Sequence, residues 1–185
     1  MDRLNSPNLP DVEIDDRFWS RYIRLVREKM LPYQWEVLND RVSDAAKSHC
    51  IENFKIAAKE STGKYYGMVF QDTDVAKWLE ALAYSLDGKR NSALEKEADE
   101  VIDLIGRAQQ EDGYLNTYYT IQEPLGKWDN LREGHELYTA GHMIEAAVAY
   151  YQATGKEKFL EIVCRLADCI CNCLLYTSPR PRDMR

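Results

Sequence analysis

The clearest pattern along the chain is a long apolar segment, Gly134–Tyr151, with the sequence GHELYTAGHMIEAAVAYY. From Met143 to Tyr151 every position is apolar or aromatic except Glu145. A helix that is apolar around most of its circumference is usually buried on several sides. The segment therefore predicts an inner helix whose first turn, which carries His135, reaches a polar cavity.

Amphipathic segments elsewhere predict further helices, at about residues 17–29, 49–60, 74–86, 91–110 and 157–171. Pro32 is expected to interrupt the first of them. Ser48 is expected to cap the second, and Thr73 or Asp74 the third. Strand signals are nearly absent, so the predicted fold class is all-α.

Two stretches of the chain resemble each other, Leu79–Ile105 and Ile144–Ile170. Each holds an apolar helix, a short glycine-containing turn and an amphipathic helix, which predicts a helical hairpin with its first helix inside. Glu80 and Glu145 occupy equivalent positions in the two copies. This equivalence favours a structural role for both residues, such as forming hydrogen bonds to a neighbouring hairpin.

The two ends of the chain differ from the helical body, residues 16–173. Residues 1–15 are polar and contain Pro7 and Pro10, which predicts an irregular leader. Because the leader lacks the apolar core of a secretory signal, we expect a cytoplasmic protein. Residues 174–185 are rich in proline and arginine and resemble a translated sequencing adaptor. We interpret them as a non-native tail, which makes the chain an N-terminal fragment.

Composition narrows the range of partners. Apolar residues make up 45% and charged residues 30% of the 185-residue chain, a mixture typical of globular proteins. The net charge of −7 argues against nucleic acid and anionic membranes as partners. No apolar run of about 18 residues, the length that spans a bilayer, is present. The five cysteines, four of them within Cys164–Cys173, predict free thiols rather than a disulfide framework.

The sequence HELYTAGH begins like the zinc-binding motif H-E-x-x-H, but Thr139 stands where the second histidine is required. His135 and His142 are separated by about 10 Å along a helix. One zinc ion, with ligands about 2 Å from the metal, does not bridge that distance. We therefore predict no metal site in this chain, a ligand contact for His135, and a hydrogen-bonded core position for His142.

A second polar segment, FQDTD, precedes the inner helix of the preceding repeat. Gln71 and Asp72 are suited to bonding sugar hydroxyls, and Phe70 to stacking on a sugar face. Helix capping by Asp72, Thr73 or Asp74 is the alternative. Glycoside hydrolysis usually requires two carboxyl groups at a defined separation, and the spacing of acidic residues alone identifies no such pair here.

Several ordered segments resemble the N-terminal part of the glycoside hydrolase family 127 catalytic domain, over about Ile14–Asn172. They are PYQWEVLNDR, SHCIENFKIAAKE, YYGMVFQDTDVAKWLEALAYSL, AQQEDGYLNTYY and GHELYTAGHMIEAAVAYYQATG. The resemblance implies an (α/α)6 toroid, of which this chain holds the first few hairpins. It also implies retaining hydrolysis of terminal β-L-arabinofuranosyl groups on plant-type oligosaccharides or glycoproteins.

In that family the nucleophile is a zinc-bound cysteine, supported by further cysteine and glutamate ligands, and a separate glutamate is the acid/base. Cys164–Cys173 do not match these residues in order or context, so the resemblance implies no catalytic residue or zinc ligand in this fragment. Zinc is expected in the full-length enzyme only. The resemblance assigns His135 to the histidine that contacts the sugar. It assigns Phe70, Gln71 and Asp72 to a turn lining the same pocket.

These assignments predict a carbohydrate substrate for the full-length enzyme and an inactive fragment. Inner helices left uncovered in a partial toroid predict poor solubility or homo-oligomerisation. Two alternatives stay open. One is a non-catalytic module of α-helical hairpins that binds another protein. The other is a different sugar-active toroid, such as an unsaturated-uronide hydrolase.

Overall fold

The computed structural model describes residues 13–86 and 90–175, and this part of the chain contains helices and loops but no strand. The all-α prediction is confirmed. The tail prediction falls largely on residues 176–185, and most of the leader on residues 1–12, both outside the described residues. No helix in the described part is long and apolar enough to cross a membrane. The elements are α1 (Trp19–Leu25), η2 (Val26–Met30), α2 (Leu31–Leu38), α3 (Cys50–Ala57), α4 (Asp72–Leu86), α5 (Ser92–Ala108), α6 (Thr117–Ile121), α7 (Glu136–Thr154), α8 (Lys158–Ile170) and η3 (Cys171–Leu175).

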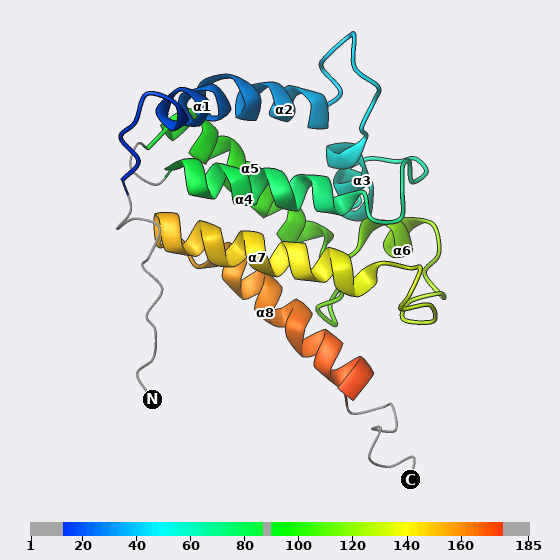
Figure 1. The fold of residues 1–185 in the computed structure, drawn as a ribbon. Coiled ribbons are helices and arrows are strands. Elements are labelled where there is room, and N and C mark those ends of the chain that lie inside the picture. Colours follow the sequence, from blue (N-terminus) through cyan, green and yellow to red (C-terminus); the bar gives the residue numbers. More distant parts are fainter. Residues whose placement is uncertain (1–12, 87–89, 176–185) are drawn as a thin grey trace, which may run out of the picture.

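The two copies of the sequence repeat fold as the hairpins α4–α5 and α7–α8 (Figure 1). Helices α4 and α7 lie side by side, and both begin at the end of the molecule where α3, α6 and the long loops gather (Figure 1). Helices α5 and α8 run back in the opposite direction. This arrangement is part of a toroid of helical hairpins, and it places the starts of α4 and α7 next to each other among loops.

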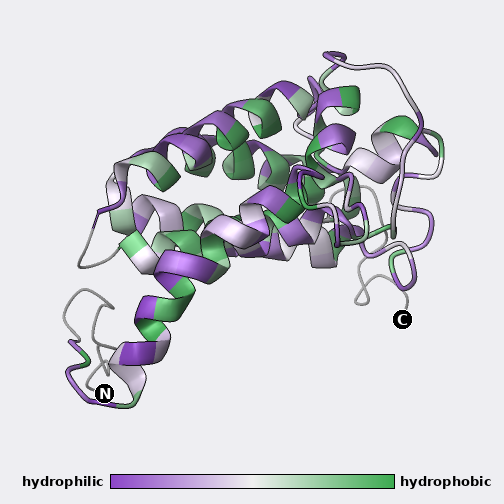
Figure 2. Ribbon diagram, turned by 90° about the horizontal axis from the view of Figure 1, so that it is seen from above, coloured by the Kyte–Doolittle hydropathy of each residue, from purple (hydrophilic) through white to green (hydrophobic). Residues whose placement is uncertain are grey.

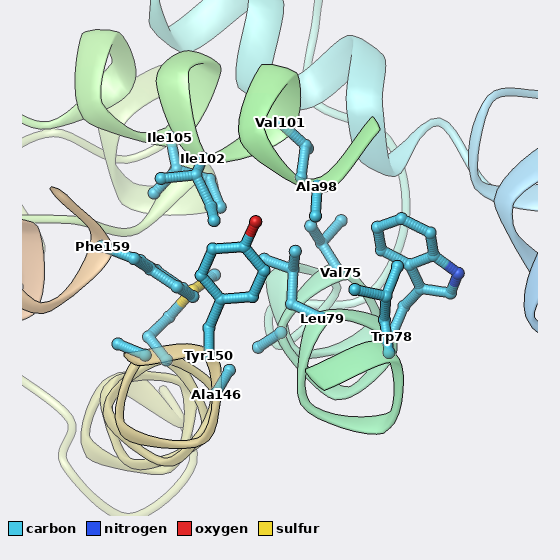
Figure 3. Close-up of a cluster of buried hydrophobic side chains, with 14 of the residues drawn as sticks. Val75, Trp78, Leu79, Ala98, Val101, Ile102, Ile105, Ala146, Tyr150 and Phe159 are labelled. Carbon is cyan, nitrogen blue, oxygen red and sulfur yellow. The ribbon is translucent and has the colours of Figure 1, made fainter. Parts of the chain in front are cut away.

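The core lies where these four helices meet (Figure 3), and hydrophobic positions concentrate between the helices (Figure 2). Leu79, Ile102, Tyr150 and Phe159 come from α4, α5, α7 and α8 and are each at most 2% exposed. Burying one large apolar side chain contributes about 1.5–3 kcal/mol. Tyr150 keeps its hydroxyl satisfied by donating a 2.8 Å hydrogen bond to Oδ1 of Asp99. The core therefore fixes both hairpins against each other.

The prediction that Pro32 interrupts the first helix is wrong. Helices α1, η2 and α2 follow one another without a break, and Pro32 lies in the first turn of α2. Proline lacks the N–H that an interior helical residue donates, but it is tolerated in a first turn. The π-helical turn η2 directly before it changes the hydrogen-bond register, so the chain continues in one direction.

The start of α3 also differs from the prediction. Ser48 does not cap the helix. Instead, Oδ1 of Asp40 accepts hydrogen bonds from the backbone N–H groups of Ser48, at 2.6 Å, and His49, at 3.0 Å. His49 has a left-handed backbone, with φ of 54°. A carboxylate from a preceding loop thus satisfies N–H groups that no helical carbonyl reaches.

Candidate substrate-binding site

The structure brings His135 and Phe70 together at the adjoining starts of α7 and α4. The imidazole of His135 lies edge-to-face with the ring of Phe70, with 5.1 Å between ring centroids. Tyr138, one turn along α7, lies 5.9 Å from His135 and 6.4 Å from Phe70. His135 and Phe70 are half-buried, whereas Tyr138 is 45% exposed. These three residues, called here the aromatic cluster, combine apolar ring faces with one imidazole.

His135 holds its position on a left-handed backbone, with φ of 52°, immediately before α7. The next residue, Glu136, is 3% exposed. Its carboxylate accepts a hydrogen bond from the Tyr114 hydroxyl at 2.5 Å and another from the Trp128 backbone N–H at 2.8 Å. Burial raises the pKa of Glu136, and these two hydrogen bonds oppose the rise. Glu136 thereby fastens the first turn of α7 to the long loop on its N-terminal side.

Sequence motifs alone assign no role to Glu136, although the helical register carries one signal. Glu136, Ala140 and Met143 are spaced by four and three residues, which places them on one face of the helix. All three are buried. A charged residue in the register of a buried face requires a partner, and that partner, Tyr114, lies 22 positions away in sequence.

Gln71 lies next to Phe70, and its amide is bonded within the protein. Its Oε1 accepts a hydrogen bond from the Met68 N–H at 3.2 Å, and its Nε2 donates to Oδ2 of Asp74, also at 3.2 Å. The same nitrogen lies 3.3 Å from Sγ of Cys50. Burial raises the pKa of the Cys50 thiol to about 12, so this sulfur is protonated at neutral pH. The side chain of Gln71 therefore braces the turn that presents Phe70.

Asp72 is 2% exposed and ties α4 to α6. Its two oxygens accept hydrogen bonds from the backbone N–H and the hydroxyl of Thr117, at 2.7 and 2.5 Å. Burial nevertheless raises the pKa of Asp72 to about 6. Of the four residues predicted to contact substrate, His135 and Phe70 thus meet in the aromatic cluster, whereas Gln71 and Asp72 bond to protein groups beside it.

His142 is not the hydrogen-bonded core histidine that the sequence predicts. Its side chain is 22% exposed, and its Nδ1 has no hydrogen-bond partner within the part of the chain that the structure describes. Within residues 13–86 and 90–175, the one group of three side chains close enough to share a metal ion is Glu80, His142 and Glu145. No cysteine belongs to this group, so the described residues do not fit the cysteine-ligated zinc that the family resemblance implies.

Comparisons with known proteins show to which family the chain belongs. The model of the β-L-arabinofuranosidase GH127 catalytic domain matches residues 11–184. The non-reducing end β-L-arabinofuranosidase of Bifidobacterium longum subsp. longum is 42% identical in an alignment 178 residues long. The match covers 86% of this chain and 27% of that protein.

Two solved structures are also similar. The GH127 β-L-arabinofuranosidase of Geobacillus stearothermophilus T6 is 66% identical, with a TM-score of 0.86, over 87% of this chain and 25% of that one. Another GH127 β-arabinofuranosidase is 36% identical, with a TM-score of 0.79, over 89% and 26%. The chain thus spans about a quarter of the length of these relatives. With a family model matched over nearly its whole length, the chain belongs to the β-L-arabinofuranosidase family that carries the GH127 catalytic domain.

Proposed function

We propose that this chain is the N-terminal part of a retaining glycoside hydrolase that releases terminal β-L-arabinofuranosyl residues from plant-type oligosaccharides or glycoproteins. The observation that carries the proposal is the half-buried imidazole of His135 beside Phe70 and Tyr138, at the starts of two inner helices. Sugar-binding sites need apolar ring faces and a few fixed polar groups. The family membership and the names of the relatives support the choice of sugar.

In this proposal His135 exchanges a hydrogen bond with a sugar hydroxyl, and the ring of Phe70 packs against the sugar. Glu136 keeps His135 in place through the buried bonds to Tyr114 and Trp128. Gln71 and Asp72 contribute to the pocket chiefly by holding the turn and α4 in position, since their polar atoms already have protein partners. A preorganised contact of this kind avoids the ordering cost when substrate binds.

We assign no step of the hydrolysis to residues of this chain. A cysteine nucleophile has to be a thiolate, and burial raises the pKa of both Cys50 and Cys169 to about 12. The catalytic groups of the parent enzyme, including its zinc ligands, are proposed to come from the part of the toroid that this chain does not contain. The chain alone is therefore expected to be inactive.

The test compares the parent enzyme with its His135→Ala variant on an aryl β-L-arabinofuranoside. Loss of one sugar hydrogen bond should raise the activation free energy for kcat/KM by about 1–3 kcal/mol. His49→Ala, at a histidine bonded to Asp40 instead, is the matched control and should keep kcat/KM. An unchanged kcat/KM in His135→Ala would remove this residue from the site. Hydrolysis by the chain alone would contradict the assignment of catalysis to the rest of the toroid.

If the parent cleaves no arabinoside, the alternative of a helical-hairpin module that binds another protein gains support. The two candidate functions, sugar binding and protein binding, also depend on different features of the aromatic cluster. A sugar site needs the imidazole of His135, whereas a protein-binding surface needs chiefly the exposed apolar area of residues such as Leu137 and Tyr138. Binding of L-arabinose to the parent, measured by calorimetry, separates the two.

A further inference from the structure

A second cluster of polar groups lies further along the same two helices. Glu80 is near the middle of α4, and His142 and Glu145 are near the middle of α7. One ligand atom from each of the three side chains lies within 4.8 Å of the others. His142 and Glu145 are three residues apart, so they share a helix face, and Glu80 approaches from the neighbouring helix.

The cluster brings two carboxylates and one imidazole together. Among the described residues, neither Glu80 nor Glu145 forms an ion pair with a lysine or an arginine. The hydroxyl of Tyr84 donates a 3.1 Å hydrogen bond to Oε1 of Glu80 and so orients that carboxylate. Two like charges at this distance repel each other unless a cation lies between them.

The imidazole of His142 supplies the third donor. Its Nδ1 is buried and has no hydrogen-bond partner among the described residues. It lies 3.2 Å from Oε2 of Glu145 without the geometry of a hydrogen bond. The ring of Tyr138 packs edge-to-face on the imidazole at 4.6 Å and limits its rotation. A buried polar atom without a partner destabilises a fold. A cation between this nitrogen and the carboxylates would satisfy all three groups.

We propose that Glu80, His142 and Glu145 bind a divalent first-row transition-metal ion, with water in its remaining positions. Carboxylates alone suit Mg²⁺ or Ca²⁺, whereas a mixed imidazole and carboxylate set suits Mn²⁺, Fe²⁺ or Zn²⁺. The site contains no cysteine and joins the inner helices of two successive hairpins, so it is separate from the cysteine-ligated zinc that the family resemblance implies. An ion bound there would link α4 to α7 near the middle of both helices, further from their N-termini than the aromatic cluster.

Mn²⁺ is the probe for the test, because thiolates are poor ligands for it and the chain carries five cysteines. The electron paramagnetic resonance signal of free Mn²⁺ is followed while the 185-residue chain is added. We expect one bound ion per chain. His142→Ala and Glu145→Gln should each weaken binding at least about tenfold, the lower end of the loss seen when even an outer partner of a metal ligand is removed.

Glu145→Gln is nearly isosteric, and its side chain is 63% exposed, so this variant is expected to fold. The matched control is His49→Ala. It removes a histidine whose Nδ1 also lies 3.2 Å from a carboxylate, that of Asp40, but which belongs to no three-residue ligand group among the described residues. The control should bind Mn²⁺ like the unmodified chain, and Mn²⁺ should raise the Tm of both. No binding at millimolar Mn²⁺, or full binding retained in His142→Ala and Glu145→Gln, would overturn the proposal.

Discussion

The hydroxyl of Tyr114 donates a 2.5 Å hydrogen bond to Oε1 of Glu136, and both side chains are at most 3% exposed. This bond joins the loop after α5 to the first turn of α7, immediately beside His135. An ionised carboxylate without partners is costly to bury. Here the Tyr114 hydroxyl and the Trp128 N–H compensate for that cost. The position of the His135 backbone therefore depends on a contact that spans 22 residues of sequence.

Tyr114→Phe should lower the free energy of unfolding by about 1–3 kcal/mol, because it removes one of two hydrogen bonds to a buried carboxylate without opening a large cavity. Urea unfolding followed by circular dichroism measures the change. The control is Tyr118→Phe, which removes a 3.1 Å bond to Glu123 at the surface and should change stability by less than about 0.5 kcal/mol. Equal losses in the free energy of unfolding would mean that the buried bond contributes no more to stability than the surface bond.

Asp72 predicts a specific pH dependence of stability. Burial raises its pKa from 3.8 to about 6, against the effect of the two bonds from Thr117. Between these two pH values the folded chain binds more protons than the unfolded chain. The free energy of unfolding therefore falls as the pH rises through this window, and the contribution of Asp72 is on the order of 3 kcal/mol.

Asp72→Asn removes the ionisable group while retaining an oxygen that accepts the Thr117 N–H. The variant should lose stability less steeply than the unmodified chain between about pH 4 and pH 6. Urea unfolding of both chains at several pH values provides the measurement, and the quantity of interest is the difference between them. A difference that stays constant with pH would show that Asp72 ionises equally in the folded and unfolded states.

The sequence predicted those parts of the fold that depend on local spacing. The apolar stripe of α5 and the nearly continuous apolar segment of α7 follow from residues three and four apart, so both helices were placed within a few residues. Asn91 illustrates how local such signals are. Its side chain accepts hydrogen bonds from Ala93 and Leu94, two and three residues later, and α5 begins directly after it.

The candidate site was predictable only in part. The pairing of Phe70 with His135 followed from the family resemblance, because nothing in their spacing brings residues 65 positions apart together. The role of Glu136 does not follow from local sequence, because its partner Tyr114 lies in a distant loop. Glu80 and Glu145 were recognised as equivalent, but the approach of His142 to both depends on how α4 packs against α7. Packing between helices is set by side chains far apart in sequence, which a local pattern does not record.

Asp40→Ala should shorten or destabilise α3. The Asp40 carboxylate accepts hydrogen bonds from the N–H groups of Ser48 and His49 and lies 3.2 Å from the imidazole of His49. Replacing a capping residue by alanine costs about 0.5–2 kcal/mol. Asp44→Ala is the matched control, because Asp44 is exposed and accepts a 2.9 Å hydrogen bond from the neighbouring Ser43 hydroxyl, a contact within one surface loop. Thermal unfolding of the two variants should separate them, with Asp40→Ala giving the lower Tm.

Two glycines should respond to alanine in opposite directions. Gly113 has φ of +88°, and a Cβ there would lie 2.3 Å from the backbone oxygen of Arg165 on α8, which cannot move without shifting that helix. Gly141 lies within α7 with open space where its Cβ would be. Gly141→Ala should therefore stabilise the chain by about 0.5–1 kcal/mol, through the better helix propensity of alanine.

Gly113→Ala should destabilise the chain by about 1–3 kcal/mol or more, because backbone strain adds to the steric overlap. Urea unfolding of both variants provides the comparison. The two variants also test whether the loop after α5 packs on the α7–α8 hairpin. The overlap at Gly113 arises only if this turn lies directly against Arg165 of α8. A Gly113→Ala variant as stable as the unmodified chain would show that this turn is free to move away from α8.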